Sequence, residues 1–151
     1  MLKAKDIMTR ELITVSPRTE ITHAAKLLIE KGINGVPVVD EGKLLGILCQ
    51  SDLIVQQKKI LIPSVFTLLD GLISLKTTKY MEKEFQKITA TTVDQILTPN
   101  PVTIHPETSI EDIASLMVDK NIHTLPVMDG DKLVGIVGKE DILRTLVPQY
   151  K

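Results

Sequence analysis

The stretch Leu133–Leu143, L-V-G-I-V-G-K-E-D-I-L, reads as a buried strand that runs into the acidic first turn of a helix. A close copy, L-L-G-I-L-C-Q-S-D-L-I, occupies Leu44–Ile54, where the aspartate keeps its position while the three residues before it differ. Sliding Ile7–Ile54 onto Ile96–Leu143, an offset of 89 residues, gives 18 identities in 48 positions without a gap. The chain therefore contains two copies of one folding unit.

Each copy predicts the element order β-α-β-β-α. In the first copy, a short β-branched strand at 12–15 precedes an amphipathic helix that Thr19 would cap and Gly32 would end. A hairpin follows, with strands at 36–39 and 44–48 around a tight turn. With about three strands, neither copy can cover both faces of its own sheet, so the two are expected to pack on each other. The second copy repeats this order, with strands at 102–104, 125–128 and 133–137 and a helix that Thr108 would cap and Asn121 would end.

The first copy has T-V-x-P at the end of the first strand, then a helix, G-I-x-x-h-P-V-h-D, a turn, and h-h-G-I-h-x-x-x-D-h, where h is aliphatic. The second copy follows the same pattern, with Ile104 in place of the Val and Asn121 in place of the first Gly. This pattern resembles the CBS domain, the repeat named after cystathionine beta-synthase. The resemblance implies an α/β (α+β) fold in which two β-α-β-β-α repeats form a pseudo-twofold pair. It also implies two clefts between the repeats, which commonly bind adenine nucleotides or adenosyl compounds, and no catalysis by the module.

Three segments are expected along the chain: a first repeat at 1–58, a helical insert at 59–92 and a second repeat at 93–151. The insert holds an apolar string at Ile60–Leu75 that is too short and interrupted to span a bilayer. This string can cover the core between the repeats or form a surface for a second copy of the chain. Because paired discs are common in the CBS family, the resemblance favours a homodimer. If the string forms the dimer surface, that surface would include Phe66, Leu69, Leu72 and Ile73.

An aspartate recurs where each hairpin meets its following helix, at Asp52 and Asp141. A carboxylate can accept a hydrogen bond from each of the two adjacent hydroxyls of a ribose, and charge-assisted bonds of this kind are strong. A position in the first helical turn also favours the ionised form. The alternative is that both aspartates only cap helices. The protein would then be a structural or protein-interaction module with no bound nucleotide.

The resemblance implies that each cleft takes its aspartate from one repeat and its base pocket from the other. Cleft A would comprise Asp141, Gly138, Thr14, Ile33, Asn34 and Pro37. Cleft B would comprise Asp52, Cys49, Ser51, Thr103, Ile122, His123 and Pro126. Many ligand-binding members have Thr or Ser three residues before the aspartate, whereas Cys49 and Gly138 stand there in this chain. Because the copies also differ at Asn34 and His123, the two clefts are not expected to be equivalent.

The composition excludes several classes of protein. A net charge of -1 and a pI near 6.3 provide no basic surface for nucleic acid, and an aromatic content of 3% offers no stacking platform. The single cysteine excludes an intramolecular disulfide and a CxxC motif. The histidines have no third ligand at a metal-binding spacing, so no metal site is expected. The N-terminus lacks the apolar segment of a secretory signal and no apolar run could span a membrane, which favours a cytoplasmic protein.

No catalytic motif such as HExxH, a P-loop or GxGxxG occurs in the chain, so the sequence predicts no enzyme. The hypothesis is a regulatory CBS pair that needs no cofactor for its fold. Its regulatory ligand would be AMP, ADP, ATP or S-adenosylmethionine, and its occupancy would act on a regulated protein that the sequence does not identify.

Overall fold

The computed structural model describes residues 1–55 and 91–147. The expected insert lies outside the described residues except for its last two, and so do the apolar residues proposed for a dimer surface. Residues 50–55 are helical. The remaining elements, in chain order, are α1 (Ala4–Ile7), α2 (Ile21–Lys31), β1 (Gly35–Asp40), β2 (Lys43–Cys49), η1 (Val93–Gln95), β3 (Thr98–Pro99), α5 (Ile110–Asp119), β4 (Thr124–Asp129), β5 (Lys132–Gly138) and α6 (Lys139–Arg144).

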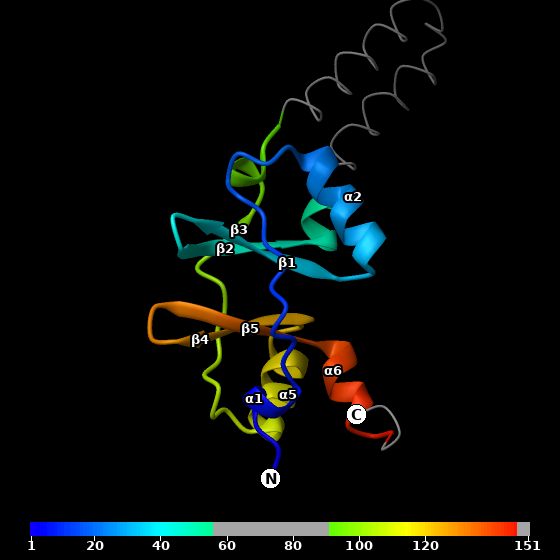
Figure 1. Ribbon diagram of the computed structural model, residues 1–151. Coiled ribbons are helices and arrows are strands. Elements are labelled where there is room, and N and C mark those ends of the chain that lie inside the picture. The colour runs from blue at the N-terminus through cyan, green and yellow to red at the C-terminus, as the bar shows by residue number, and fades with distance from the viewer. Residues whose placement is uncertain (56–90, 148–151) are drawn as a thin grey trace, which may run out of the picture.

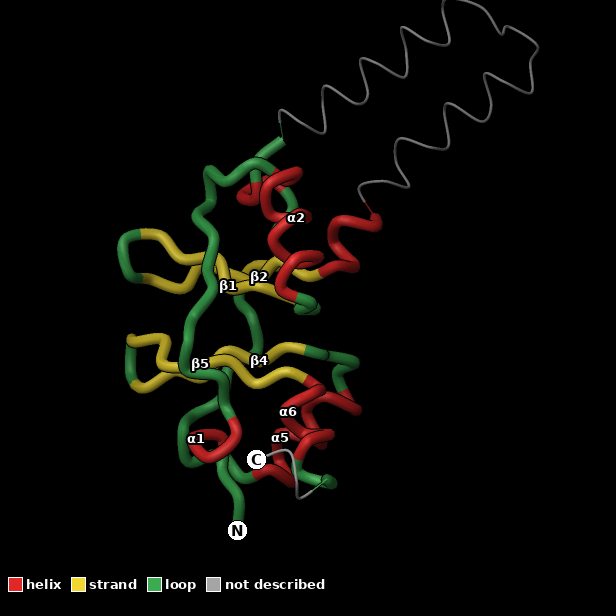
Figure 2. Tube along the Cα trace, turned by 45° about the vertical axis from the view of Figure 1, so that its right-hand side comes forward, coloured by secondary structure: helices red, strands yellow, loops and turns green. Residues whose placement is uncertain are grey.

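The molecule consists of two stacked antiparallel hairpins, β1-β2 and β4-β5, with α2 outside the first and α5 outside the second (Figures 1 and 2). The two hairpins have the same break in strand register, between Val38 and Val39 in the first and between Val127 and Met128 in the second. The predicted pair of mixed α/β repeats is therefore confirmed. The hairpin turn of the first repeat has positive φ at both Glu41 and Gly42, as a type I′ turn requires.

The strands expected at 12–15 and 102–104 are reduced to single parallel bridges, Val15 with Val38 and Ile104 with Val127. The amide of Val15 donates to the carbonyl of Pro37 at 3.1 Å, and the amide of Val39 donates to Val15 at 2.9 Å. The next bond of a parallel ladder would need an N–H at Pro37, and proline has none. Pro126 limits the bridge at Ile104 in the same way. The prolines of the hairpins therefore set the length of the neighbouring strands.

The helix caps also differ from the sequence prediction. The hydroxyls of Thr19 and Thr108 accept from the amides of Ser16 and His105 at 3.1 and 2.9 Å, which closes the turns before the helices. Helix α5 is capped instead by Ser109, whose hydroxyl accepts from Asp112, while α2 has no side-chain cap. The expected helix faces are confirmed, since Ile21, Ala24, Leu28 and Ile113 are buried, and so are the positive φ values at Gly32 and Asn121.

Each repeat packs its leading segment against the other repeat. Ala4 is fully buried in the core of the second repeat, beside Ile113 and Leu125. Its amide donates to the carbonyl of Thr108 at 2.8 Å, and Thr9 pairs with Ile136 of β5. The reciprocal segment begins at η1, where Val93 is buried in the core of the first repeat. It continues into β3, which pairs with β2 through Thr98 and Ile47. The two repeats therefore exchange the first residues of their expected ranges.

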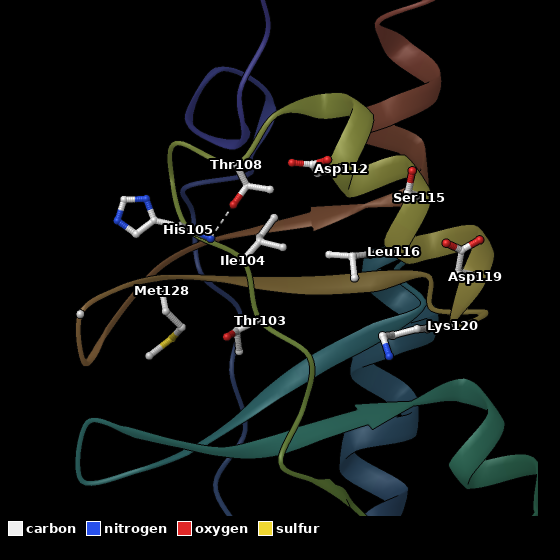
Figure 3. Close-up of a pocket in the computed structure, with 11 residues that line it drawn as sticks. Thr103, Ile104, His105, Thr108, Asp112, Ser115, Leu116, Asp119, Lys120 and Met128 are labelled. Atoms are coloured by element: carbon white, nitrogen blue, oxygen red, sulfur yellow. Dashed lines mark hydrogen bonds between the residues drawn. The ribbon is translucent and has the colours of Figure 1, made fainter.

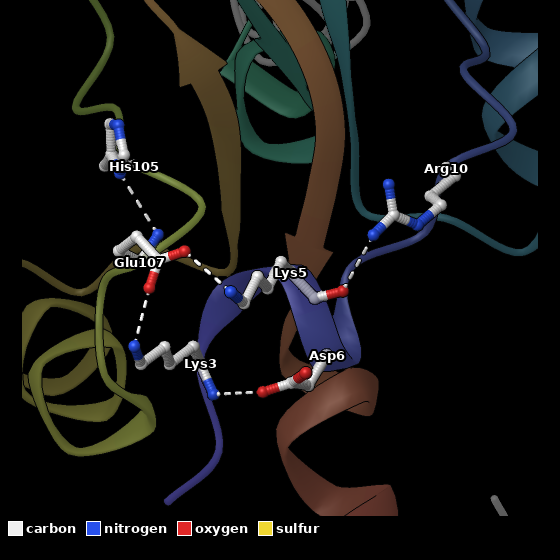
Figure 4. A network of polar contacts seen from close by, with 6 residues as sticks. All are labelled: Lys3, Lys5, Asp6, Arg10, His105 and Glu107. Atoms are coloured by element: carbon white, nitrogen blue, oxygen red, sulfur yellow. Dashed lines mark hydrogen bonds and ion pairs between the residues drawn. The ribbon is translucent and has the colours of Figure 1, made fainter.

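An exposed ionic network ties the N-terminal segment to the second repeat (Figure 4). The ammonium groups of Lys3 and Lys5 contact the two carboxylate oxygens of Glu107 at 2.6 and 2.7 Å. These hydrogen bonds, first from Lys3 and then from Lys5, lower the pKa of Glu107 to about 2. The stability contribution of the network is therefore complete above the ordinary carboxyl pKa and is lost only as the pH falls toward 2.

The two exchanged segments cross the hairpins at glycines. A Cβ at Gly46 would collide with the backbone carbonyl of Thr98, and a Cβ at Gly135 would lie 2.5 Å from the sulfur of Met8. A backbone carbonyl held in a strand pair cannot move aside, whereas the flexible thioether can. Gly46 and Gly135 are thus required by the exchange itself, and Gly46 more strictly.

We expect Gly46→Ala to destabilise the fold more than Gly135→Ala does. Overpacking in a tight contact costs roughly 1–3 kcal/mol; the first variant should lie at or above the top of that range and the second near the bottom. Urea denaturation measures both. Leu45→Ala, a change at an exposed neighbour of Gly46, serves as the control and should alter the unfolding free energy little. Equal losses at the two glycines would contradict the proposed crossing geometry.

Candidate functional site

Both recurrent aspartates cap the helices in which they lie. One carboxylate oxygen, Oδ2, accepts from the amide three residues earlier at 2.8 Å, from Cys49 at Asp52 and from Gly138 at Asp141. A carboxylate has two oxygens and about four acceptor positions, so a cap leaves most of its capacity unused. The capping role and the ribose-binding role considered from the sequence are therefore compatible.

The second oxygens of the two aspartates have different neighbours. Oδ1 of Asp52 accepts from the hydroxyl of Thr98 at 3.2 Å, whereas Oδ1 of Asp141 lies 3.4 Å from the guanidinium of Arg144. Burial raises the pKa of Asp141, and this outweighs the lowering by the Gly138 amide and by Arg144. Burial therefore opposes the helix N-terminus at Asp141, because desolvation raises the pKa whereas a position in the first helical turn favours the ionised form.

A cavity of about 200 Å³ between the repeats corresponds to cleft A. Five of the six residues expected there line it: Asp141, Gly138, Ile33, Asn34 and Pro37. Thr14 does not, and Ile13 takes its place. Side chains alternate along an extended segment, so Ile13 faces inward with the buried Val15 while Thr14 is exposed.

A larger cavity, about 530 Å³, corresponds to cleft B. Of the residues expected there, Cys49, Ser51, Ile122 and His123 line it. Val102 lines cleft B in place of Thr103, by the same alternation, and Pro126 is fully buried. Asp52 is absent from the lining, but its carboxylate accepts from the hydroxyl of Thr98, which does line the cleft.

Thr9 lines cleft A and Thr98 lines cleft B. Neither is among the site residues that the resemblance to the CBS family implied. Each belongs to an exchanged segment, so each reaches the cleft from outside the repeat of its nearest aspartate. They bring a hydroxyl to the region where the sequence offers only Cys49 and Gly138. The signal for them was present in the sequence, because Thr9 and Thr98 are identical at the repeat offset of 89.

A third hollow lies outside the inter-repeat region, along α5 and the segment before it (Figure 3). It encloses about 700 Å³ but is open to solvent, and all its lining residues belong to the second repeat. Thr103, expected in cleft B, is found here beside His105 and Asp112. Neither capping aspartate reaches this hollow, so the two inter-repeat clefts remain the candidate site.

The thiol of Cys49 lines cleft B in its protonated form. Burial, and secondly the negative charge of Asp52, raises its pKa to about 11. A thiol rather than a thiolate is therefore present at neutral pH, and a thiol is a poor nucleophile and a weak hydrogen-bond donor. Cys49 contributes an apolar wall to the cleft.

We expect Cys49 in the folded protein to react with iodoacetamide about a hundredfold more slowly at pH 8 than in urea. The reason is that a pKa raised by about two units lowers the thiolate fraction about a hundredfold. Mass spectrometry of the alkylated chain measures the rate. Asp52→Asn should increase it modestly by removing the second cause of the shift, and equal rates in folded and unfolded protein would contradict the assignment.

The chain belongs to the CBS domain family, whose model matches residues 4–58 and 93–148. It is 31% identical over 151 residues to the chloroplastic CBS domain-containing protein CBSX2 of Arabidopsis thaliana, covering 92% of this chain and 61% of that protein. It is 32% identical over 142 residues to the CBS domain-containing protein YhcV of Bacillus subtilis, covering 94% and 84% respectively. The chain thus spans about three fifths of the length of CBSX2 and most of YhcV.

Two solved structures share the fold over nearly the whole chain. The crystal structure of CBSX2 in complex with AMP superposes with a TM-score of 0.73 at 26% identity, covering 100% of both chains. The CBS domain pair of protein MJ0100, in complex with 5′-methylthioadenosine and S-adenosyl-L-methionine, superposes with a TM-score of 0.70 at 30% identity. That match covers 99% of this chain and 98% of the other.

Two features are absent from the described residues, 1–55 and 91–147. None of their helices is long and apolar enough to cross a membrane. Within the same ranges, no group of three or more His, Cys, Asp or Glu side chains is arranged to hold a metal ion.

Proposed function

We propose that this protein is a regulatory CBS pair that binds an adenosine-containing ligand, AMP, ADP, ATP or S-adenosylmethionine, in the clefts between its repeats. The observation that carries the proposal is the position of Asp141. Its carboxylate lines cleft A with one oxygen on its cap, and among residues 1–55 and 91–147 the other oxygen contacts only Arg144, at 3.4 Å. Facing it across the cleft are Ile33, Asn34 and Pro37 of the other repeat. This arrangement offers a hydroxyl acceptor opposite a largely apolar pocket.

The complexes of CBSX2 with AMP and of the MJ0100 pair with adenosyl compounds support this ligand class. The dimensions of the clefts are consistent with it. Small-molecule sites typically enclose about 300–1,000 Å³, and cleft B is within that range at about 530 Å³. Cleft A is narrower, at about 200 Å³. A ribose that bonds to Oδ1 of Asp141 there competes with Arg144 for this oxygen.

The second candidate function is a structural or protein-interaction module with no bound nucleotide. The contact between Asp52 and Thr98 favours it, because both oxygens of this carboxylate already have partners in the folded chain. A ribose in cleft B would have to share this carboxylate with the Thr98 hydroxyl or displace it. The two candidate functions therefore make different predictions, because only the first requires a ligand whose binding depends on Asp52 and Asp141.

We expect AMP to stabilise the wild-type fold and Asp52→Asn with Asp141→Asn to remove that effect. AMP at 100 times its dissociation constant should add about 2.7 kcal/mol if only the folded state binds. Asparagine retains a cap oxygen, so the ligand-free stability should change little, but its NH₂ group cannot accept from a ribose hydroxyl. Thermal unfolding with and without AMP measures both quantities.

Asp112→Asn, at an exposed position in the first turn of α5, is the matched control and should keep the full shift. A wild-type protein that neither AMP, ADP, ATP nor S-adenosylmethionine stabilises would favour the structural module. A shift that survives in the double variant would show that the ligand binds elsewhere.

We further propose that the protein is a homodimer. Large apolar side chains are exposed at equivalent positions of the two repeats, Ile29 with Val118 on α2 and α5, and Ile54 with Leu143 on the helices that follow the hairpins. A surface with approximate twofold symmetry is suited to an isologous contact. The apolar string of the insert, expected to form a dimer surface, lies outside the described residues.

Ile29→Glu with Val118→Glu should convert the dimer into folded monomers. A buried carboxylate without a partner costs about 3 kcal/mol or more, whereas in the monomer both side chains are mostly exposed, at 78% and 79%. Sedimentation velocity reports the mass and circular dichroism the fold. Leu45→Glu, at an exposed position of β2, should leave the dimer intact. A dimer that persists in the double variant would exclude this surface.

The proposal includes no catalytic activity of this chain. The protonated thiol of Cys49 supports that, since a cleft nucleophile would need the thiolate. The cytoplasmic location and the absence of a nucleic-acid partner remain predictions from the sequence. Both repeats contribute to each cleft, so a bound ligand would change how the two repeats are placed relative to each other. The regulated protein would respond to that change.

A further inference from the structure

Lys139 lies at the boundary between the two clefts and lines both of them, together with Asn34 and Thr124. Its backbone is fixed, because its amide donates to the carbonyl of His123 at 3.1 Å. Its side chain is exposed. Among residues 1–55 and 91–147, its ammonium group has no ion-pair or hydrogen-bond partner. A free cation therefore stands where the two candidate sites meet.

The equivalent residue of the first repeat, Gln50, differs from Lys139 in its charge and in the contacts of its side chain. Its amide donates to Asn34 at 2.9 Å, as that of Lys139 does to His123. The side chain of Gln50 is neutral and donates to the carbonyl of Ile33 at 3.0 Å, and it lines cleft B alone. Within the described part of the chain, this pair of equivalent positions thus supplies one free cation for two clefts.

The charges around the clefts make this cation important to an anionic ligand. In cleft B, Lys139 is the only Lys, Arg, Asp or Glu among the described lining residues. In cleft A, Arg144 is held by Asp141 and Glu140 at 3.4 and 3.6 Å. Lys31 and Glu11 also line cleft A, but neither lines cleft B. Among the described residues, Lys139 is therefore the one cation that a phosphate in either cleft can meet.

We propose that Lys139 couples the two clefts by pairing with the phosphate of one bound nucleotide at a time. This inference rests on the proposed function, since it needs a nucleotide in the clefts. A lysine ammonium is a compact charge on a flexible stem, so it can turn toward either cleft. Once it is paired, a second phosphate can no longer pair with Lys139 and is repelled by the charge of the first phosphate. Binding in one cleft therefore weakens nucleotide binding in the other.

The test measures each cleft alone and then both together. Ser51 and Glu140 are equivalent exposed residues, and each lines one cleft only, cleft B and cleft A respectively. Ser51→Trp is designed to block cleft B and Glu140→Trp to block cleft A. Calorimetric titration should show one AMP per chain in each blocked variant. Each background is then combined with Lys139→Met, which keeps the length of the side chain and removes its charge.

We expect Lys139→Met to weaken AMP binding about tenfold in both blocked backgrounds, the loss of a charge-assisted hydrogen bond. Adenosine, which has no phosphate, should bind equally well with and without this substitution. With both clefts open, the cleft that fills second should bind AMP about tenfold more weakly than the same cleft does in the variant whose other cleft is blocked. Lys132→Met, at an exposed position of β5 outside both clefts, should change none of these affinities.

The outcomes separate this inference from the proposed function. An effect of Lys139→Met on one cleft only, or a second AMP that binds as tightly as in the blocked background, would overturn the coupling and leave nucleotide binding intact. A loss of adenosine affinity equal to that of AMP would also overturn it, because the lysine would then support the shape of the clefts. A wild-type chain that binds S-adenosylmethionine but no adenine nucleotide would overturn the coupling alone, whereas one that binds none of AMP, ADP, ATP and S-adenosylmethionine would refute the proposed function.

Discussion

The architecture depends on the exchange of leading segments between the two repeats. Ala4 completes the core of the second repeat and Val93 completes the core of the first, so neither repeat has its full core without the other. The same segments cover the outer edges of β2 and β5 through Thr98 and Thr9, where unpaired strand groups would otherwise be exposed. Packing and hydrogen bonding therefore both require that the two repeats fold together.

The exchange also shapes the clefts. Because the leading segments run along the hairpins, they bring Thr9 and Thr98 to the clefts. Thr98 is bonded directly to Asp52, so the state of cleft B and the position of the exchanged segment are linked by one hydrogen bond. A ligand that displaced this hydroxyl would act on a segment packed into the core of the first repeat. This is a physical route by which occupancy can change the relation of the repeats.

The duplication preserves what the backbone needs and changes what faces the clefts. The aspartate caps, the glycines at the crossings and the hairpin prolines are the same in both copies. The backbone bonds from Gln50 to Asn34 and from Lys139 to His123 are equivalent as well. The side chains at these positions differ, so two sites with similar backbones have different charges and volumes.

Local chemistry in the sequence was sufficient for the repeat, the order of elements, the hairpin turns and the buried helix faces. Periodicity and turn residues act over a few residues, and these features need nothing more. The single-residue bridges at Val15 and Ile104 are limited instead by prolines of the paired strand, Pro37 and Pro126, although the β-branched runs suggested longer strands. Five of the six residues expected in cleft A do line it, because in each repeat the family motif places them within the hairpin or directly next to it.

Tertiary structure decided the rest. That Ala4 packs in the second repeat, that Thr98 donates to Asp52, and that Lys139 lines both clefts are facts about residues brought together from distant parts of the chain. The pKa of Asp141 belongs to the same class, since its direction is set by burial and not by helix position. A sequence determines each repeat through contacts between near neighbours, whereas the clefts exist only after two repeats, 89 residues apart, have packed face to face.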